Sequence, residues 1–257
     1  MKQILSIIFL FILLIFSSFY PLGEHSYKVR TIVIDAGHGG KDPGCHGTKG
    51  IEAKITLSMA LELGRIIKEN MPGVKVYYTR MTDNFVELHD RAAIANRNNA
   101  DLFISIHCNS GPSTVRGTET FVMGLHSSED NLDVAKRENA VVLKEDNYKK
   151  NYDGFDPNSP QAHILFSLYQ NAYIENSILF ASKLENQFSK RVGRTSRGVK
   201  QAGFLVLWKT AMPSVLIEIG YLTNEVEEKY LNNKNNQVLM ASGIYRAVKE
   251  YKTEIEN

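Results

Sequence analysis

Hydrophobic and polar positions along the chain alternate between short β-branched runs and longer runs with helical spacing. Residues 29–35 (VRTIVID) have the composition of a strand and lead into the glycine-dense loop AGHGGKDPG. Further short apolar runs predict strands at residues 75–80, 102–107, 118–123, 204–207 and 215–219. Apolar residues that recur every three or four positions predict helices at residues 54–70, 86–97, 173–190 and 238–251.

This alternation predicts an α/β fold with one mainly parallel, twisted sheet of about six strands and helices on both of its faces. We expect one domain over residues 28–253. In such sheets the functional site forms beyond the carboxyl ends of the strands.

One connection breaks this rhythm. Residues 124–171 are rich in charge, and so long a connection inside a compact domain is usually functional or mobile. We therefore treat residues 124–171 as an insertion. Within it, residues 129–143 are predicted to form a helix, with Leu132, Ala135 and Val142 on its apolar side.

The amino terminus has the pattern of an export signal. Lys2 precedes an apolar run over residues 4–16 that continues to Phe19. The run is rather short for a membrane span, which needs about 20 apolar residues. Residues 1–25 are therefore predicted to be a signal peptide, with a retained N-terminal anchor as the alternative. Either one places the remainder of the chain outside the cytoplasm.

Composition narrows the function classes. Thirty Lys and Arg residues against 28 Asp and Glu residues give a net charge of +2, without the basic excess expected of a nucleic-acid-binding protein. The two cysteines, Cys45 and Cys108, are expected to be partly buried free thiols, and a disulfide is the alternative in an oxidising compartment. No predicted helix has an unpartnered apolar face that would require an obligate oligomer, so we expect a monomer.

Four residues that can carry chemistry fall at the ends of predicted elements: His38, Glu52, His107 and Glu218. Two histidines and a carboxylate suit zinc, and three protein ligands leave a fourth position for water, whose pKa zinc lowers to about 7. A second carboxylate outside the metal site would accept a proton from that water and pass it to the leaving nitrogen. Glu218 lies within the apolar run LIEI, where a carboxylate is costly unless it is paired or bound to metal. A histidine at a strand end is, by itself, more often structural.

Five strings follow one another along the chain in a fixed order: IDAGHGGKDPG, GIEAKITLSMAL, LFISIHCNS, RGVKQAGFLVL and MPSVLIEIGYLTN. With these strings the chain resembles the zinc-dependent N-acetylmuramoyl-L-alanine amidases, of the exported Gram-negative type. The resemblance implies one zinc ion per chain, bound by His38, Glu52 and His107, with Glu218 as the catalytic acid and base. The implied substrate is peptidoglycan, cut at the amide between N-acetylmuramic acid and the L-alanine of the stem peptide. The implied setting is the periplasm, in cell-wall remodelling or daughter-cell separation.

Several residues are candidates for supporting roles. Arg80, Asp83 and Arg91 form a TRMTDN…DR pattern similar to that of the family, and we expect a buried ion pair that supports the sheet. Asn109 is expected either to orient ligands and substrate or to form a turn. Asp35 is expected to cap the glycine loop.

In exported amidases of the resembled type, an inserted helix covers the active site until an activator protein removes it. Residues 124–171 occupy the corresponding place in this chain. We hypothesise that residues 129–143 form such a lid and that Glu138 caps the open zinc position. The alternative is an excursion that binds substrate.

Two other functions remain open at this point. One is a zinc peptidase that acts on ordinary peptides, since the metal chemistry would be the same. The other is a non-catalytic module that binds the cell wall or activates another enzyme.

Overall fold

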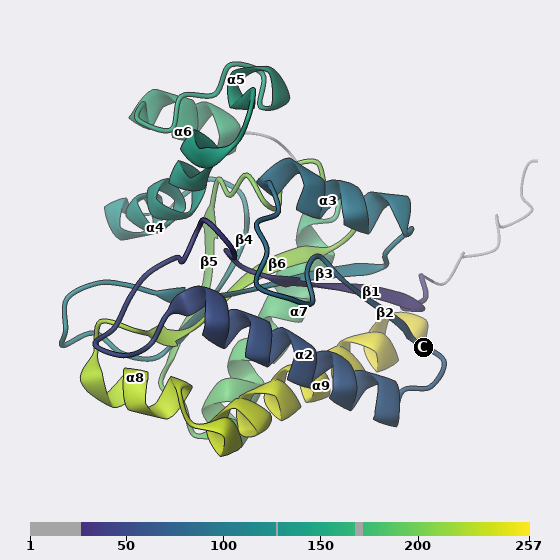
Figure 1. Ribbon diagram of the computed structural model, residues 1–257. Helices are drawn as coiled ribbons and strands as arrows, with labels where there is room; N and C mark the ends of the chain where they lie inside the picture. The colour runs from purple at the N-terminus through teal and green to yellow at the C-terminus, as the bar shows by residue number, and fades with distance from the viewer. Residues whose placement is uncertain (1–26, 127, 168–171) are drawn as a thin grey trace, which may run out of the picture.

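Six strands form one sheet in the order β2-β1-β3-β6-β4-β5 (Figure 1). The computed structural model describes residues 27–126, 128–167 and 172–257, so the predicted leader, residues 1–25, lies outside them. Neighbouring strands are parallel except β4 and β6, which are antiparallel. The prediction of a mainly parallel α/β sheet is confirmed. The strands are β1 (Thr31–Ala36), β2 (Lys75–Tyr78), β3 (Leu102–Asn109), β4 (Thr118–Met123), β5 (Ser196–Ala202) and β6 (Ser214–Tyr221).

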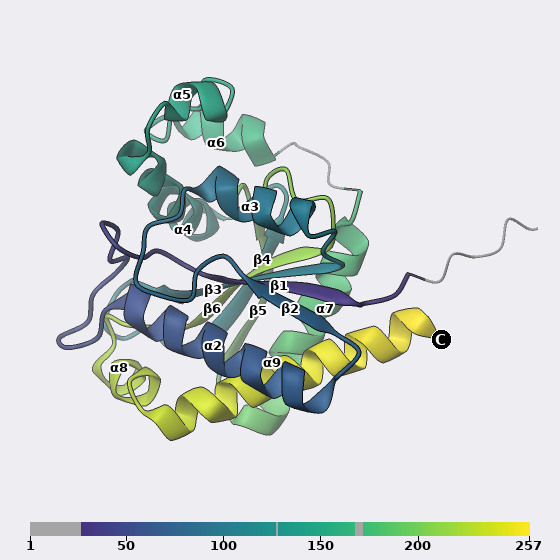
Figure 2. The same ribbon diagram turned by 45° about the vertical axis from the view of Figure 1, so that its right-hand side comes forward.

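Helices cover both faces of this sheet, as predicted (Figures 1 and 2). One face packs against α2 (Glu52–Asn70), α7 (Ile174–Gln187) and α9 (Lys234–Glu256). The other face packs against α3 (Leu88–Arg97) and the insertion. A short helix, α8 (Glu225–Leu231), follows β6. The alternation of side chains along each buried strand supplies both cores.

One predicted strand is wrong. Residues 204–207 form a buried turn rather than a strand, and their side chains pack into the core beneath α3 and the insertion. The side-chain amide of Asn139 makes the backbone hydrogen bonds that a neighbouring strand would otherwise make. It donates to Gly203 O at 2.7 Å and accepts from Leu205 N at 2.8 Å. The sixth strand is instead β5, whose polar sequence SRGVKQA suits a half-exposed sheet edge.

The insertion stands over one face of the sheet (Figure 1). The predicted helix over residues 129–143 is an α-helix, α4 (Glu129–Asn139), followed by a 3-10 turn (Ala140–Lys144). Ser128 caps α4 by accepting from Asn131 N. Two short helices, α5 (Tyr148–Asn151) and α6 (Pro160–Ser167), follow. Across the part of the chain that the structure describes, no helix is both long and apolar enough to span a bilayer.

Glu145 joins the insertion to the rest of the domain. Its carboxylate accepts from Leu88 N, at the start of α3, at 2.7 Å and from the Tyr152 hydroxyl at 2.6 Å. The same hydroxyl accepts from His89 N at 2.8 Å. Side chains of the insertion therefore satisfy amide donors in the first turn of α3, which have no partner inside the helix.

A buried ion pair supports the end of β1. Arg91 donates to Asp35 at 2.8 Å, and Ser105 and Thr79 donate to the same carboxylate at 2.6 Å each. Burial raises the pKa of Asp35, but Arg91 and the two hydroxyls outweigh it and hold the pKa below its usual value. The expectation that Asp35 caps the glycine loop is wrong, since its carboxylate is paired with Arg91 and two hydroxyls. A buried ion pair does support the sheet, but its acid is Asp35 rather than Asp83, which accepts from Gly40 N.

We expect Arg91→Met to lower the free energy of unfolding by about 3–5 kcal/mol, because it leaves the Asp35 carboxylate buried without its cation. Urea unfolding followed by circular dichroism measures the change. Arg97→Met, at the exposed end of the same helix, is the control and should change stability by about 0.5 kcal/mol or less. A similar small effect for both variants would contradict the assigned role of the ion pair.

Candidate metal centre and active site

The glycine loop after β1 brings His38 against the end of β3. His38 has a positive φ of 61°, a conformation that is uncommon for a residue with a side chain. Arg91 donates to His38 O at 3.0 Å and holds the backbone there. Gly37 allows the close approach of the two histidines, because a Cβ at this position would lie 2.5 Å from the His107 ring.

Glu52, the first residue of α2, lies beneath both histidines and is fully buried. Its two carboxylate oxygens accept from Cys45 N and Cys108 N, both at 2.8 Å. Burial raises the pKa of Glu52, but His38 and His107 outweigh it and hold the pKa well below its usual value. The carboxylate is therefore ionised and fixed in orientation.

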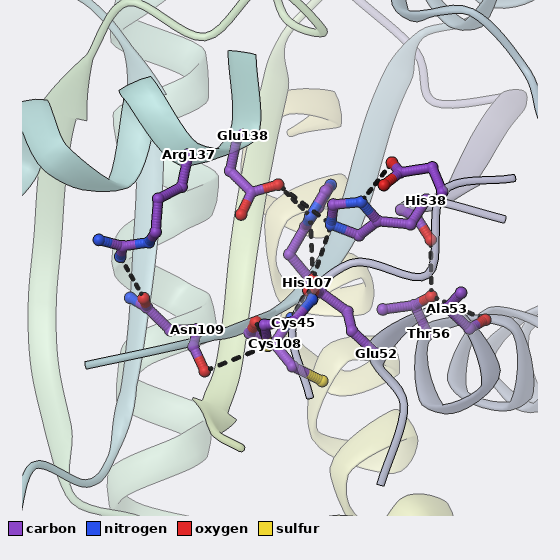
Figure 3. A network of polar contacts seen from close by, with 12 residues as sticks. His38, Cys45, Glu52, Ala53, Thr56, His107, Cys108, Asn109, Arg137 and Glu138 are labelled. Atoms are coloured by element: carbon purple, nitrogen blue, oxygen red, sulfur yellow. Dashed lines mark hydrogen bonds and ion pairs between the residues drawn. The ribbon is translucent and has the colours of Figure 1, made fainter. Parts of the chain in front are cut away.

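Four side chains direct donor atoms toward one point (Figure 3). Glu52 Oε1 lies 3.1 Å from His38 Nε2 and 3.2 Å from His107 Nδ1. Glu138 Oε2, from α4, lies 3.2 Å from His38 Nε2 and 2.9 Å from His107 Nδ1. Ligands about 2.0 Å from a tetrahedral ion are about 3.3 Å apart, so these spacings fit such an ion.

The hydrogen bonding of the described residues also supports a cation at this cluster. His38 Nε2, His107 Nδ1 and Glu138 Oε2 are buried there without a hydrogen-bond partner of acceptable geometry. Such atoms are costly unless a cation or a proton compensates them. Burial lowers the pKa of His107, but Glu138 and Glu52 outweigh it and raise the pKa to about 10. The potential that attracts a proton there also attracts a metal cation, so the cluster can hold a metal ion.

Asp42 orients His38 from behind. Its Oδ2 lies 2.7 Å from His38 Nδ1, which leaves Nε2 directed toward the other donors. Lys144, in the 3-10 turn of the insertion, donates to Asp42 Oδ1 at 2.7 Å. A carboxylate on the remote nitrogen of a metal-binding histidine fixes its tautomer and raises its basicity. Sequence reasoning missed Asp42, although its position four residues after His38 in the glycine loop was a usable signal.

Glu218 lies beside this cluster but outside it. It is paired in register with His107 on β3 and is fully buried, and neither of its oxygens has a hydrogen-bond partner in the described part of the chain. Burial, followed by repulsion from Glu138, raises the pKa of Glu218 well above its usual value. A carboxyl group with a raised pKa can hold a proton at neutral pH and can exchange it with a reacting group.

The supporting candidates take different places. Arg80 donates to the carbonyl oxygens of Ala36, Gly37 and Ala53 at 2.7–2.9 Å and so holds the glycine loop against α2. It forms no ion pair within the described residues, contrary to the expectation for this pattern. Asn109 accepts from Arg137 of α4 at 2.8 Å and donates to Glu119 at 2.6 Å. It therefore links the insertion to β4.

Both cysteines are free thiols, as predicted. Cys45 Sγ donates to Cys108 O at 3.0 Å, and burial raises the pKa of both thiols. Their contribution to the cluster is the pair of backbone donors that hold Glu52.

An α/β sheet with a buried histidine and glutamate cluster that can hold a metal ion, and a free carboxyl group beside it, is an arrangement that suits a hydrolase. The comparisons identify the family. The N-acetylmuramoyl-L-alanine amidase family model matches residues 32–250, and the chain belongs to this family. It is an N-acetylmuramoyl-L-alanine amidase, an enzyme that acts on peptidoglycan.

Individual relatives agree with this assignment. The chain is 31% identical to N-acetylmuramoyl-L-alanine amidase AmiA of Escherichia coli, over 90% of this chain and 79% of AmiA. It is 32% identical to the catalytic domain of CwlV from Bacillus (Paenibacillus) polymyxa, with a TM-score of 0.64 over 86% of this chain and 97% of that domain. The fold is shared with the CwlD amidase from Clostridioides difficile, solved in complex with the GerS lipoprotein, at 24% identity and a TM-score of 0.64 over 88% and 99% of the two chains.

We expect Asp42→Asn to weaken the binding of Zn²⁺, used as the probe, by about 10–100-fold, because the amide cannot support His38 as a carboxylate does. Competition with a chromogenic chelator measures the dissociation constant. Asp83→Asn is the control, since Asp83 accepts from Gly40 N in the same loop but does not contact His38. Equal affinities of both variants and the parent would rule out this role for Asp42.

Proposed function

We propose that this amidase is zinc-dependent and that His38, Glu52 and His107 hold the ion. The observation that carries the proposal is the set of donor atoms spaced for a tetrahedral ion beside a free carboxyl group. Imidazole nitrogens together with carboxylate oxygens suit zinc better than magnesium or calcium, which prefer oxygen ligands alone.

Each protein group then has a defined task. Zinc, when bound, supplies a Lewis acid that polarises the amide carbonyl and acidifies water. Glu218 accepts a proton from the attacking water and delivers it to the amide nitrogen, which is a poor leaving group until it is protonated. The fully buried position of Glu218 suits this exchange, because burial raises its pKa and so favours proton uptake by its carboxylate.

We further propose that α4 is an autoinhibitory lid. Glu138 Oε2 takes the fourth donor position, where water and the substrate carbonyl would otherwise lie. Three further contacts hold the lid closed: Arg137 to Asn109, Lys144 to Asp42, and Asn139 to the turn at Gly203. An activator protein that moves α4 would open the site. That an amidase with this fold, CwlD, forms a complex with a lipoprotein supports a role for such a partner.

The remaining proposals concern the setting of the enzyme. Residues 1–25 act as a signal peptide or N-terminal anchor, and the monomeric catalytic domain of residues 28–253 works in the periplasm. The insertion, residues 124–171, regulates it. The biological role is cell-wall remodelling or the separation of daughter cells.

Digestion of purified sacculi tests the reaction. Zinc-loaded protein with the lid opened by Glu138→Ala should release stem peptides that carry a free L-alanine amine, identified by mass. Chelator treatment should abolish the release. Cleavage inside the peptides instead would identify a zinc peptidase.

Glu218→Ala in the same background should lower turnover at least about 100-fold, because general acid–base catalysis typically contributes a factor of that size or more. Zinc stoichiometry should stay at one per chain, as Glu218 lies outside the donor cluster. Metal analysis and peptide release are measured on the same samples. Undiminished turnover would remove the role assigned to Glu218.

Glu138→Ala should raise the turnover of the otherwise intact chain by roughly 10–100-fold, the range that corresponds to losing one charge-assisted contact. Glu129→Ala, at the exposed start of the same helix, is the control and should leave turnover unchanged. An unchanged or lower rate for Glu138→Ala would count against the lid.

A further inference from the structure

A second buried carboxylate gathers two cations next to the site. Glu119 on β4 is fully buried, and its Oε1 accepts from Asn109 at 2.6 Å and from the Tyr221 hydroxyl at 3.0 Å. Its Oε2 accepts from Arg197 Nε at 3.1 Å and from Lys200 Nζ, both on β5. One negative charge thus faces two positive charges, so the cluster carries a net positive charge.

Both cations line a cavity that shares Ser110 and Arg137 with the cavity at His38 and Glu138. The side chains of Arg197 and Lys200 are 34% and 19% exposed, and they line a hollow of about 230 Å³ with Asn109 and Tyr221. The Arg197 guanidinium lies over the Tyr221 ring, 5.5 Å from its centroid, which limits its freedom. The hollow is therefore a preformed site with positive charge on its floor.

The lid helix also lines this hollow. Asp130, Asp133 and Arg137 of α4 face it, while Glu138 of the same helix reaches the metal centre. The closed lid thus places carboxylates both at the donor cluster and along the hollow. If α4 moved away, the hollow would lose these side chains, and Arg197 and Lys200 would become more accessible.

The sheet register sets the distance between this hollow and the reacting amide. Glu119 is paired with Glu218 on β6, and β5 lies one strand further out. Strands are about 4.8 Å apart, so β5 lies about 10 Å from β6. An extended peptide covers about 3.3–3.6 Å per residue, so this distance corresponds to two or three residues.

We propose that Arg197 and Lys200 form a carboxylate-binding subsite that selects peptides with a free carboxylate two or three residues beyond the scissile amide. The proposal rests on the amidase function proposed above and specifies its substrate class. Paired cations held by a buried acid and an aromatic ring bind a carboxylate through charge-assisted hydrogen bonds. On the closed enzyme, Asp130 and Asp133 of α4 line the same hollow.

The test uses matched substrates, so that a general loss of stability cancels. Muramoyl tripeptides are prepared in which the carboxylate of the second or the third residue is either free or a primary amide. The full-length, zinc-loaded Glu138→Ala protein is expected to cleave one free-acid substrate with a kcat/KM roughly tenfold above that of its amide. Adding Lys200→Gln or Arg197→Gln should reduce this preference to less than about threefold.

Lys249→Gln, at an exposed position on α9, removes the same charge elsewhere and should keep the full preference. The subsite is overturned if the parent shows no preference at either residue, or if both β5 variants retain it. Should no protein turn over any substrate, dissociation constants for the same compounds are measured by calorimetry. A binding preference lost in the β5 variants then supports the subsite while the hydrolytic role fails, and equal binding overturns the subsite.

Discussion

The rest of the site depends on two imidazoles, His38 and His107, that lie between buried carboxylates at the carboxyl edge of the sheet. Neighbouring hydrogen-bond donors and acceptors stabilise these charged groups. Glu52 is held by two backbone amides, and His38 is held by Asp42. Three of the donor atoms directed inward, on His38, His107 and Glu138, have no hydrogen-bond partner among the described residues, so a cation is the natural complement of the cluster. Glycines at the positions nearest the histidines give the room for this crowding.

The proposed regulation and the proposed specificity depend on the same elements. The insertion contacts the ligand-supporting residue Asp42 through Lys144, the strand end through Arg137, and α3 through Glu145. Moving α4 would therefore change the metal centre and the cationic hollow over β5 together. The donor cluster and the hollow lined by Arg197 and Lys200 both attract negative charge. The acidic side chains of α4 could therefore compete with a negatively charged substrate at both sites.

Some elements could be predicted from local pattern alone, and others could not. The buried strands β1, β3 and β6 have continuous apolar runs, so periodicity finds them readily. Strand β5 lies at the sheet edge and keeps a polar sequence, whereas residues 204–207 are apolar because they fill the core as a turn. Hydrophobicity reports burial, and burial does not distinguish a strand from a buried turn.

The sequence by itself determined the α/β class, the family, and the residues His38, Glu52, His107, Glu138 and Glu218 as candidates, because motif order and residue chemistry are local properties. Their assignment to zinc binding, acid–base catalysis and inhibition stays a prediction. Only the tertiary structure decided that the donor atoms of the first four lie together with Glu218 outside their cluster, and that Asp42 and Glu119 support their neighbours. These contacts join residues from different strands and loops, and strand register and loop closure, which no local pattern encodes, set their distances.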